Sequence, residues 1–370
     1  MSIETVPFTE YFDFAPKSKR KSGDGLEEGA YPFFVSSQTL IKRTNEPDYE
    51  GEALVFGTGG NPSVHYISGK FSTSGDCLVA FPKKNKEAAR AINYFLRGNI
   101  HLLEEGFKGA GLKHISKKYI SALEIPKLEE LNVDNLAYVL DKAGGIRKKR
   151  RQAILELNTL LAASFIDMFG SPITNSKEMP TKKIKKIGKV VTGNTPSRKK
   201  TEYYGDHIEW IKSDNINTPY HYLTKADESL SEIGKSVGRV VPKGSILVTC
   251  IAGSKSCIGN SAMTNREVAF NQQINAIITN DKAIKTKFLY TQLFIAKGLV
   301  QKASTNSMKG MVSKSKFEEI DILCPPIEEQ NMFETIFNEY YEAFERMNMA
   351  LIESENIYKS LTQKAFEGAL

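Results

Sequence analysis

Lysine and arginine side chains crowd one short segment of the chain, where they have the chemistry to hold phosphate groups. Residues 171–200 carry nine Lys or Arg and a single acid, Glu178. Such a run attracts polyanions, although a solvated surface loop would have the same composition. The turn 193–197 (Gly-Asn-Thr-Pro-Ser) lies inside this run and adds hydroxyl and backbone N–H groups. It is interpreted either as a phosphate-facing loop or as a plain connection between two strands.

Signatures of catalysis and of metal binding are missing from the sequence. It has no Gly-x-x-x-x-Gly-Lys-Ser/Thr phosphate loop and no Asn-Pro-Pro-Phe/Tyr or Asp-Pro-Pro-Tyr segment. The turn 57–60 (Gly-Thr-Gly-Gly) hints weakly at a nucleotide loop, but Pro62 follows and no amphipathic helix begins there. The cysteines lack Cys-x-x-Cys spacing and the histidines lack metal-ligand spacing. The sequence therefore predicts no catalytic residue and no metal site.

Length and composition are typical of a soluble globular protein with two or three folding units. The chain has 370 residues, 41% of them hydrophobic and 25% charged, with a formal net charge of +7. No unbroken run of 18 apolar residues occurs, which predicts no membrane span. Residues 1–7 lack the basic start and apolar stretch of a signal peptide, so we expect a cytoplasmic protein with reduced cysteines.

Two long helices are expected to position these segments, at 131–170 and 328–370. Apolar residues in both step by three and four, and the second keeps this alternation over four heptads, as a coiled-coil seam does. The pair Gly144-Gly145 would weaken the first helix by about 1 kcal/mol per residue relative to Ala. Neither helix could bury its stripe alone, so we expect them to pack on each other. The seam positions assigned to the subunit interface are Leu136, Leu140, Leu157, Leu161, Phe337, Phe344, Leu351, Tyr358 and Leu361.

The chain contains an internal repeat with a period near 200 residues. Residues 51–55 (Gly-Glu-Ala-Leu-Val) match 244–248 (Gly-Ser-Ile-Leu-Val), and a similar Pro-rich threshold precedes each long helix. Short β-branched or aromatic segments bounded by Gly, Pro or Asn lie between the helices. The predicted fold class is α+β, with α/β domains at 1–130 and 171–327 separated by the two helices. A pseudo-twofold axis would make the helices an antiparallel coiled coil and give two similar binding faces.

Several segments resemble the specificity subunit of type I restriction-modification systems. They are 192–197 (Thr-Gly-Asn-Thr-Pro-Ser), 202–205, 208–214 (Ile-Glu-Trp-Ile-Lys-Ser-Asp), 271–277, 325–330 and 164–170. The resemblance covers essentially the whole chain, because the family alternates two target-recognition domains with two helical spacers. The first domain departs from the pattern: it lacks Thr-Pro-Ser and Trp-Ile-Lys-Ser equivalents and opens with Phe8-Thr9-Glu10-Tyr11-Phe12.

The resemblance implies a non-catalytic DNA-binding subunit in a phage-defence complex. Each domain would read one half of a bipartite target in double-stranded DNA, and the helices would fix the spacer between the halves. The helices would also dock methyltransferase subunits, expected to be two, which methylate adenine N6 with S-adenosylmethionine. Restriction and translocase subunits would add cleavage with ATP and Mg²⁺. The subunit itself would hold no cofactor.

Candidate DNA contacts follow from the groups that DNA recognition requires, which are cations for phosphates and amide or guanidinium groups for base edges. In the first domain they are Thr58, Asn61, Lys70, Lys108, Lys113 and Lys118. In the second they are Asn194, Thr195, Ser197, Arg198, Lys199, Lys212, Ser213, Ser254, Lys255, Gln272, Gln273 and Lys309. The two glutamines could read adenine or could equally satisfy loop backbone groups. Trp210, the single tryptophan, is interpreted as a core residue.

Two functions of other classes stay open at this stage. An autonomous DNA-modifying enzyme would need the catalytic motifs that the sequence lacks. A non-catalytic coiled-coil scaffold would explain the long helices, but it would not explain a duplicated domain rich in lysine and amide side chains.

Overall fold

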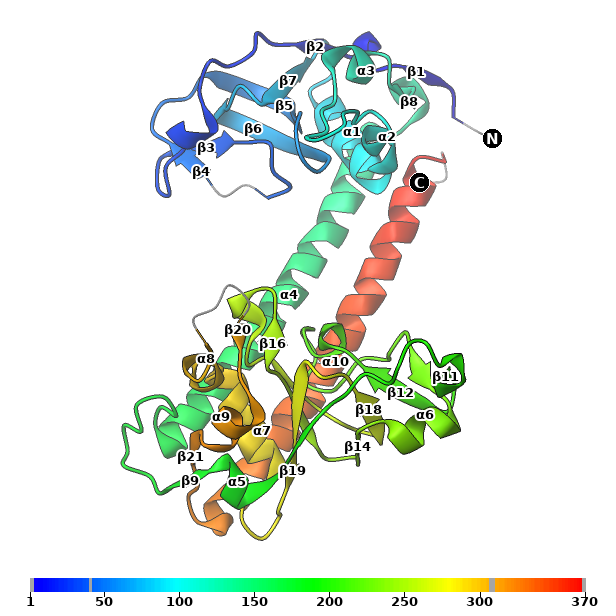
Figure 1. Cartoon of the computed structure of the whole chain (residues 1–370). Helices are drawn as coiled ribbons and strands as arrows, with labels where there is room; N and C mark the ends of the chain where they lie inside the picture. The colour runs from blue at the N-terminus through cyan, green and yellow to red at the C-terminus, as the bar shows by residue number, and fades with distance from the viewer. Residues whose placement is uncertain (1–2, 40–41, 306–309, 368–370) are drawn as a thin grey trace. The chain divides into compact units, whose positions relative to one another are not determined.

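The computed structural model describes residues 3–39, 42–305 and 310–367 (Figure 1). The chain divides into two compact units. Unit 1 combines the residues up to 152 with those from 347 onward, and unit 2 comprises 153–346. Each unit therefore consists of one mixed α/β domain together with part of each long helix.

Unit 1 is built on a six-stranded sheet with the order β2-β7-β5-β6-β3-β4. Side chains of β5 alternate between two cores: Leu54 and Phe56 face one cluster, and Ala53 and Val55 face the other. Helix α1 packs on the first of these faces through Ala91, Ile92 and their neighbours (Figure 1). The strands are β1 (Thr5–Pro7), β2 (Phe12–Phe14), β3 (Tyr31–Phe34), β4 (Lys42–Thr44), β5 (Tyr49–Gly57), β6 (Ser63–Thr73), β7 (Cys77–Pro82) and β8 (Glu124–Pro126). The short helices are α1 (Glu87–Gly98), α2 (His101–Glu104) and α3 (Lys117–Ser121).

Unit 2 contains a four-stranded sheet, β10-β19-β15-β17, and a five-stranded sheet, β11-β13-β12-β18-β14. Two further pairs, β16 with β20 and β21 with β9, complete its described strands. The strands are β9 (Thr181–Lys183), β10 (Gly188–Thr192), β11 (Tyr204–Gly205), β12 (Ile208–Ile211), β13 (Ser229–Leu230), β14 (Val240–Val241), β15 (Ile246–Thr249), β16 (Ile251–Ala252), β17 (Ser261–Met263), β18 (Val268–Phe270), β19 (Ile274–Thr279), β20 (Gly310–Met311) and β21 (Asp321–Leu323). The short helices are α5 (Ile184–Ile187), α6 (Glu232–Val237), α7 (Thr286–Ile295), α8 (Gly298–Lys302) and α9 (Lys314–Glu318).

The register of the strands shows that the two units repeat one topology. The order β2-β7-β5-β6 in unit 1 corresponds to β10-β19-β15-β17 in unit 2, with every neighbouring pair antiparallel. Each unit also contains one parallel pair, β3 with β6 and β12 with β18. The predicted α+β fold class and the internal repeat are thus confirmed within the units.

The two long helices are α4 (Val133–Phe169) and α10 (Ile327–Ala365). Within unit 1 the guanidinium of Arg147 stacks 4.1 Å above the ring of Tyr358, and Arg151 pairs with Glu355. Within unit 2 the rings of Phe165 and Phe333 lie 5.2 Å apart. In unit 2 the hydroxyl of Tyr340 also donates to Oδ1 of Asn158. In each unit, a residue further along α4 contacts a residue nearer the start of α10, so the helices run antiparallel there. The helix predicted over 328–370 ends at Ala365, and residues 368–370 lie outside the described residues.

Helix α4 contains an apolar stretch and a pair of glycines, and each of these allows more than one interpretation from the sequence. By length and composition alone, it has one stretch long and apolar enough to cross a membrane. In unit 2, however, its Phe165 and Phe169 are fully buried against Phe288 of α7 and Phe333 of α10. These two rings are thus part of the core of that unit. The helix also runs through Gly144-Gly145 without a break.

Candidate nucleic-acid interface

Two parallel strands of unit 2 end at the same edge of a sheet. The chain leaves β12 at residues 212–213 and leaves β18 at residues 271–273. The N–H of Asn271 donates to the carbonyl of Ile211 at 3.0 Å, which fixes the two exits side by side. Because the carboxyl ends of parallel strands meet at one edge, two polar segments that are distant in sequence lie together.

The turn after β10 joins this edge as a third segment. The N–H of Gly193 donates to the carbonyl of Ile274 at 3.1 Å, and a Cβ at position 193 would lie only 2.1 Å from the carbonyl oxygen of Asn271. Only glycine allows the chain to approach so closely. The hydroxyl of Thr195 then donates to Oε1 of Gln272. Three of the segments predicted from the sequence therefore converge, and we call them together the unit 2 edge: residues 193–200, 212–213 and 271–273.

Some of the predicted amides at this edge have structural partners. Nδ2 of Asn194 donates to the carbonyl of Val237 at 2.9 Å, and its Oδ1 accepts from the N–H of Arg239 at 2.8 Å. Oε1 of Gln273 accepts from Nδ2 of Asn271 at 3.0 Å. The Asn194 amide and the Gln273 oxygen thus stabilise the loops, whereas Gln272 is exposed and has only the Thr195 hydroxyl as a recorded partner among the described residues.

Two cations of the unit 2 edge surround the buried indole of Trp210. The guanidinium of Arg198 lies 5.0 Å from that ring and 4.4 Å from the ring of Tyr204, and Nζ of Lys212 lies 5.4 Å from the indole. The indole N–H donates to the carbonyl of Asn194 at 3.2 Å. Trp210 is only 3% exposed, which agrees with its interpretation as a core residue. Its face therefore serves as a platform that orients the two cations.

The carboxylate of Glu228 forms ion pairs with both of these cations. Nη1 of Arg198 lies 2.7 Å from Oε2 of Glu228, and Nζ of Lys212 contacts the other oxygen of that carboxylate. Arg198 and Lys212 lower the pKa of Glu228 below its ordinary value. Two cations and one anion leave a charge of +1 at this cluster. Lys199, Ser197 and Thr195 are exposed beside it, while Ser213 is half-buried at the start of the next turn.

The predicted pair Ser254 and Lys255 lies on the turn after β16, next to the same edge. The carbonyl of Gln273 accepts from the N–H groups of Cys250 and Ile251, which brings that strand alongside residues 271–273. The hydroxyls of Ser254 and Ser256 lie 2.7 Å apart, and the side chain of Lys255 is exposed. Lys309, predicted for this region, lies outside the described residues.

In unit 1 the hairpin loop between β5 and β6 gathers several predicted residues. Lys108 and Gly59 each form a bridge with His114, so residues 58–61, 108 and 113–114 are neighbours. Asn61, Lys108 and Lys113 are exposed. Thr58 is buried, and its hydroxyl donates to the carbonyl of Asp76 at 2.8 Å, so this side chain stabilises the loop.

The two remaining predicted residues of unit 1 lie apart from that loop. In the strand register Lys70 lies opposite Glu50, near the start of β5 and at the opposite end of the β5–β6 hairpin. Lys118 is exposed on α3, whose N-terminus is capped by Ser116. The structure therefore brings together the loop residues and leaves Lys70 separate from them.

The first domain has structural counterparts to the strand ends of the second, although it lacks their sequence motifs. Strand β3 runs parallel to β6, and the N–H of Ser74 donates to the carbonyl of Phe34 at 2.8 Å, as Asn271 does to Ile211 in unit 2. Residues 35–37 and 74–76 thus occupy the places of 212–214 and 271–273. Sequence comparison missed them because Phe33-Phe34-Val35-Ser36 and Trp210-Ile211-Lys212-Ser213 share only the final serine.

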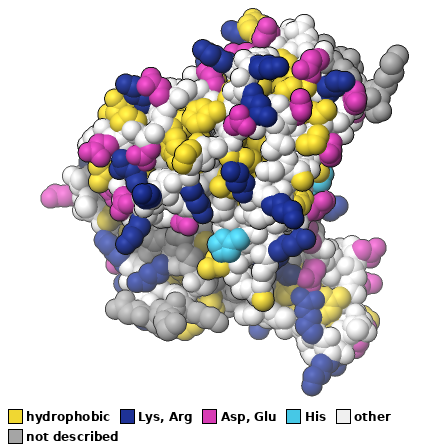
Figure 2. All heavy atoms as spheres, turned by 90° about the horizontal axis from the view of Figure 1, so that it is seen from above, with side chains coloured by type: hydrophobic (Ala, Val, Ile, Leu, Met, Phe, Trp, Pro, Cys, Tyr) yellow, Lys and Arg dark blue, Asp and Glu magenta, His cyan; other side chains and the backbone are white. Residues whose placement is uncertain are grey.

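Charges on the molecular surface are mixed. On the face that Figure 2 shows, Lys and Arg side chains lie among Asp and Glu side chains and form no uninterrupted basic field. Within the described ranges, no group of three or more His, Cys, Asp or Glu side chains is placed to hold a metal ion. What the edges offer chemically is therefore hydrogen bonding and, at the unit 2 edge, local positive charge.

Comparison with known protein families shows which family has this duplicated arrangement. The model of the type I restriction modification DNA specificity domain matches the chain twice, over residues 3–154 and 176–354. The chain belongs to the type I restriction-modification DNA specificity family. Each match spans one mixed domain and a large part of the long helix that follows it, in agreement with the repeat.

Individual members of the DNA specificity family resemble parts of the chain. The MjaIX specificity subunit of Methanocaldococcus jannaschii is 32% identical over 175 residues, and the HindI specificity subunit of Haemophilus influenzae is 32% identical over 149 residues. These segments cover 46% and 39% of this chain, but only 39% and 31% of the two relatives. The fold is similar to the crystal structure of a type I restriction-modification system S subunit from M. genitalium, with a TM-score of 0.63 and 14% identity, over 98% of this chain and 96% of that one.

The helix seam of this family member is largely internal to the chain. Leu136, Leu140, Leu161, Phe337 and Phe344 are at most 2% exposed. They pack within their own unit, so their assignment to an interface with other subunits is corrected. Leu157, Leu351, Tyr358 and Leu361 are half-buried. The apolar side chains that the long helices do expose are Tyr138, Ile146, Leu155, Leu160, Ile166, Met332, Met349, Ile352 and Ile357.

Proposed function

We propose that this chain is the DNA specificity subunit of a type I restriction-modification complex that works in the cytoplasm. Each mixed domain reads one half of a bipartite target in double-stranded DNA. The observation that carries the proposal is the duplicated edge, where polar groups gather at the ends of two parallel strands in each unit and are joined in unit 2 by Arg198 and Lys212. The family match supports it, because the specificity-domain model fits each of the two copies.

The long helices are proposed to set the spacer and to dock partner subunits. Both α4 and α10 run from one unit into the other, so their length is shared by the two reading domains. Their exposed apolar side chains, such as Leu155 and Ile352, suit contact with other proteins. In this proposal two methyltransferase subunits bind there and methylate adenine N6 with S-adenosylmethionine. Restriction and translocase subunits would add cleavage with ATP and Mg²⁺, and the specificity subunit holds no cofactor.

The deciding experiment is single-molecule sequencing of DNA from cells that co-express this chain with its methyltransferase, scored for N6-methyladenine. We expect one bipartite motif that disappears when this chain is omitted. A stable complex that yields no motif would contradict the proposal and would favour a scaffold. Methylation or cleavage by the purified chain alone would instead favour an autonomous enzyme.

Lys199→Ala and Lys212→Ala are each expected to weaken DNA binding by the assembled complex. Each lysine that neutralises a phosphate releases one counterion, so its loss should lower the slope of log K against log salt by about 0.9. Binding measured by fluorescence anisotropy over a salt series gives that slope. Lys243→Ala is the matched control, because Lys243 is exposed in the turn before β15, at the far end of that strand from residues 271–273. Slopes equal to that of the control would remove both lysines from the interface.

A further inference from the structure

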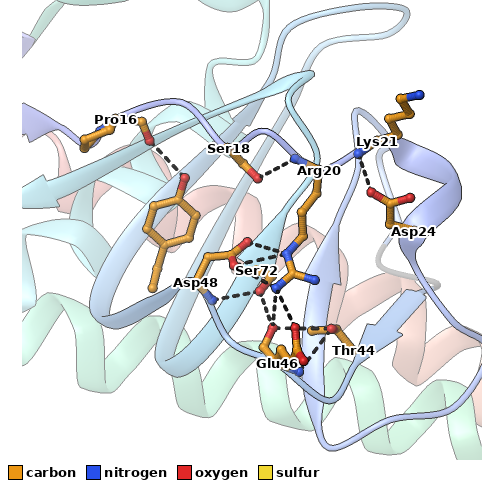
Figure 3. A network of polar contacts seen from close by, with 10 residues as sticks. Pro16, Ser18, Arg20, Lys21, Asp24, Thr44, Glu46, Asp48 and Ser72 are labelled. Atoms are coloured by element: carbon orange, nitrogen blue, oxygen red, sulfur yellow. Dashed lines mark hydrogen bonds and ion pairs between the residues drawn. The ribbon is translucent and has the colours of Figure 1, made fainter.

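Arg20 of unit 1 lies at the centre of a polar network that the sequence patterns did not single out (Figure 3). Its Nε lies 2.8 Å from Oδ2 of Asp48 and its Nη2 lies 2.9 Å from Oδ1, so the contact is two-pronged. Nη2 also reaches the carbonyl of Glu46 at 3.3 Å and the carboxylate of Glu46 at 3.5 Å. The N–H of Asp48 donates to the hydroxyl of Ser72 at 2.8 Å, which anchors the acidic side of the network to β6.

Strand register shows that Arg20 and Arg198 occupy the same position of the duplicated unit. Phe14, the last residue of β2, pairs with Ala80, and the next N–H along the chain donates to the carbonyl of Val79, at 2.9 Å. In unit 2, Thr192 ends β10 opposite Asn275, and the next N–H donates to the carbonyl of Ile274. Each arginine follows its strand end by six residues. Each is also bound by a carboxylate from another segment, Asp48 in one unit and Glu228 in the other.

The free edge of the Arg20 guanidinium has the geometry to read a base. Asp48 holds the Nε/Nη2 side. The outward edge consists of Nη1, which has no recorded hydrogen-bond partner among the described residues, and of Nη2, which must turn from its 3.3 Å contact with the carbonyl of Glu46 to complete a two-pronged contact. The side chain is 27% exposed, so part of it can be reached from solution. A guanidinium presents donors in a fixed fork, and a carboxylate on one side of the fork orients the other side. Guanine offers the matching pair of acceptors, O6 and N7, in the major groove.

Charge distinguishes a base from a phosphate as the partner of this network. Arg20 with Asp48 and Glu46 has a net charge of −1, which disfavours a phosphate but does not disfavour a neutral base edge. The carboxylate of Glu46 is 82% exposed beside the guanidinium. A carboxylate accepts from the N4 amino group of cytosine, which is the partner of guanine. Donor and acceptor together thus suit both halves of a G·C pair.

We propose that Arg20 reads the guanine of a G·C base pair in one half of the DNA target and that Asp48 is the residue that positions it. By strand register Arg198 is its counterpart for the other half, with Glu228 in the positioning role. The net charge of −1 is particular to the Arg20 network, because Arg198, Lys212 and Glu228 together have a charge of +1. This assignment rests on the proposed function. It adds a contact in the first domain, where the loop 58–61 and its neighbours supply the other candidates.

The test uses the complex of this chain with its methyltransferase and a set of duplexes, each with one base pair of the bipartite motif replaced. The wild-type complex should discriminate against replacement of one G·C pair by roughly 5- to 150-fold, the range for a two-pronged arginine contact. In Arg20→Ala that preference should fall to within about twofold at that position only. Arg20→Lys should lose it as well, because lysine keeps the charge but lacks the fork. Asp48→Asn should weaken discrimination at the same position.

Controls separate reading from a purely structural ion pair. Lys83→Ala removes another partly exposed ion pair of unit 1, that of Lys83 with Asp13, at the opposite end of β2, and should leave every preference unchanged. Arg198→Ala should relax a position in the other half of the motif. Equal weakening on all duplexes with a shallower salt slope would place Arg20 on a phosphate and overturn the assignment. Unchanged preferences in both Arg20 variants would overturn it too, with the proposed function intact. A wild-type complex without any sequence preference would overturn the proposed function itself.

Discussion

Lengthening α4 and α10 by one heptad each is expected to widen the gap between the two halves of the methylated motif by about three base pairs. Seven helical residues add about 10 Å at 1.5 Å per residue, and duplex DNA rises 3.4 Å per base pair. Seven residues also restore nearly the same helix face, so the apolar seam stays in register. Sequencing of N6-methyladenine in cells that carry the variant gives the new gap directly.

The two insertions must be placed at paired positions, because the helices run antiparallel within each unit. Within unit 1, Arg150 of α4 contacts the carbonyl of Ala350 on α10 and Arg151 pairs with Glu355, so one heptad after Arg151 and one before Ala350 keep the partners matched. A seven-residue insertion at Asp281-Lys282, in an exposed turn of unit 2, is the control and should leave the gap unchanged. Altered half-site sequences, or an unchanged gap with the complex assembled, would contradict the spacer role of the helices.

The repeat and the long helices could be predicted because their signals are local or periodic. Heptad spacing places Phe337 and Phe344 on one stripe, and both are fully buried. The glycine pair at 144–145 was a reason to expect weakness, yet the helix is continuous there. The ring of Tyr358 packs 3.9 Å from where a Cβ of Gly144 would lie, so tertiary contact stabilises the segment despite its propensity.

The arrangement of the site could be predicted only in part, because it depends on which strands pair. The polar segments at 193–200, 212–213 and 271–273 were identified one by one, but their convergence follows from the parallel pairing of β12 with β18. Thr58 was assigned to the interface from its position in the internal repeat, whereas the fold directs its hydroxyl to the carbonyl of Asp76. Arg20 was missed because residues 15–20 (Ala-Pro-Lys-Ser-Lys-Arg) share little with residues 193–198. Register, which no local pattern encodes, makes them equivalent.

Unit 2 is expected to lose about 3 kcal/mol of folding free energy as the pH falls from 6.5 to 4, because of one buried histidine. His221 is 1% exposed, and burial lowers its pKa from 6.5 to about 4. Its Nδ1 lies 2.8 Å from the hydroxyl of Tyr290, and its Nε2 lies 2.5 Å from the hydroxyl of Tyr340. That hydroxyl donates to Oδ1 of Asn158 at 2.5 Å. Both ring nitrogens of His221 and both tyrosine hydroxyls have a hydrogen-bond partner when the imidazole is neutral.

The direction of this pH effect depends on whether the folded or the unfolded state binds the proton of His221 more tightly. The unfolded chain protonates His221 below pH 6.5, whereas the folded unit resists protonation until about pH 4. The stabilisation is therefore complete above pH 6.5 and declines by about 1.4 kcal/mol per pH unit between those values. Rings surround the histidine, among them Phe294, Phe337 and Phe344, and none of them can stabilise a buried positive charge as a carboxylate would.

Chemical denaturation at several pH values, followed by the fluorescence of Trp210, measures this effect in unit 2. The indole is the only one in the chain and is buried in that unit, so its signal reports the unfolding of the region that holds His221. In His221→Gln the slope between pH 6.5 and 4.5 should disappear, while the unit is less stable at pH 7. His207→Gln replaces an exposed histidine of the same unit and should keep the wild-type slope.

Carboxylates that are stabilised by cations do not mask the effect of the histidine. Glu228, for example, contributes to the folding free energy above pH 4.5 and loses that contribution only as the pH falls below this value. A wild-type protein whose stability is constant from pH 6.5 to 4.5 would show that His221 is charged in the folded unit, and the contacts through Tyr340 to Asn158 would then have to rearrange.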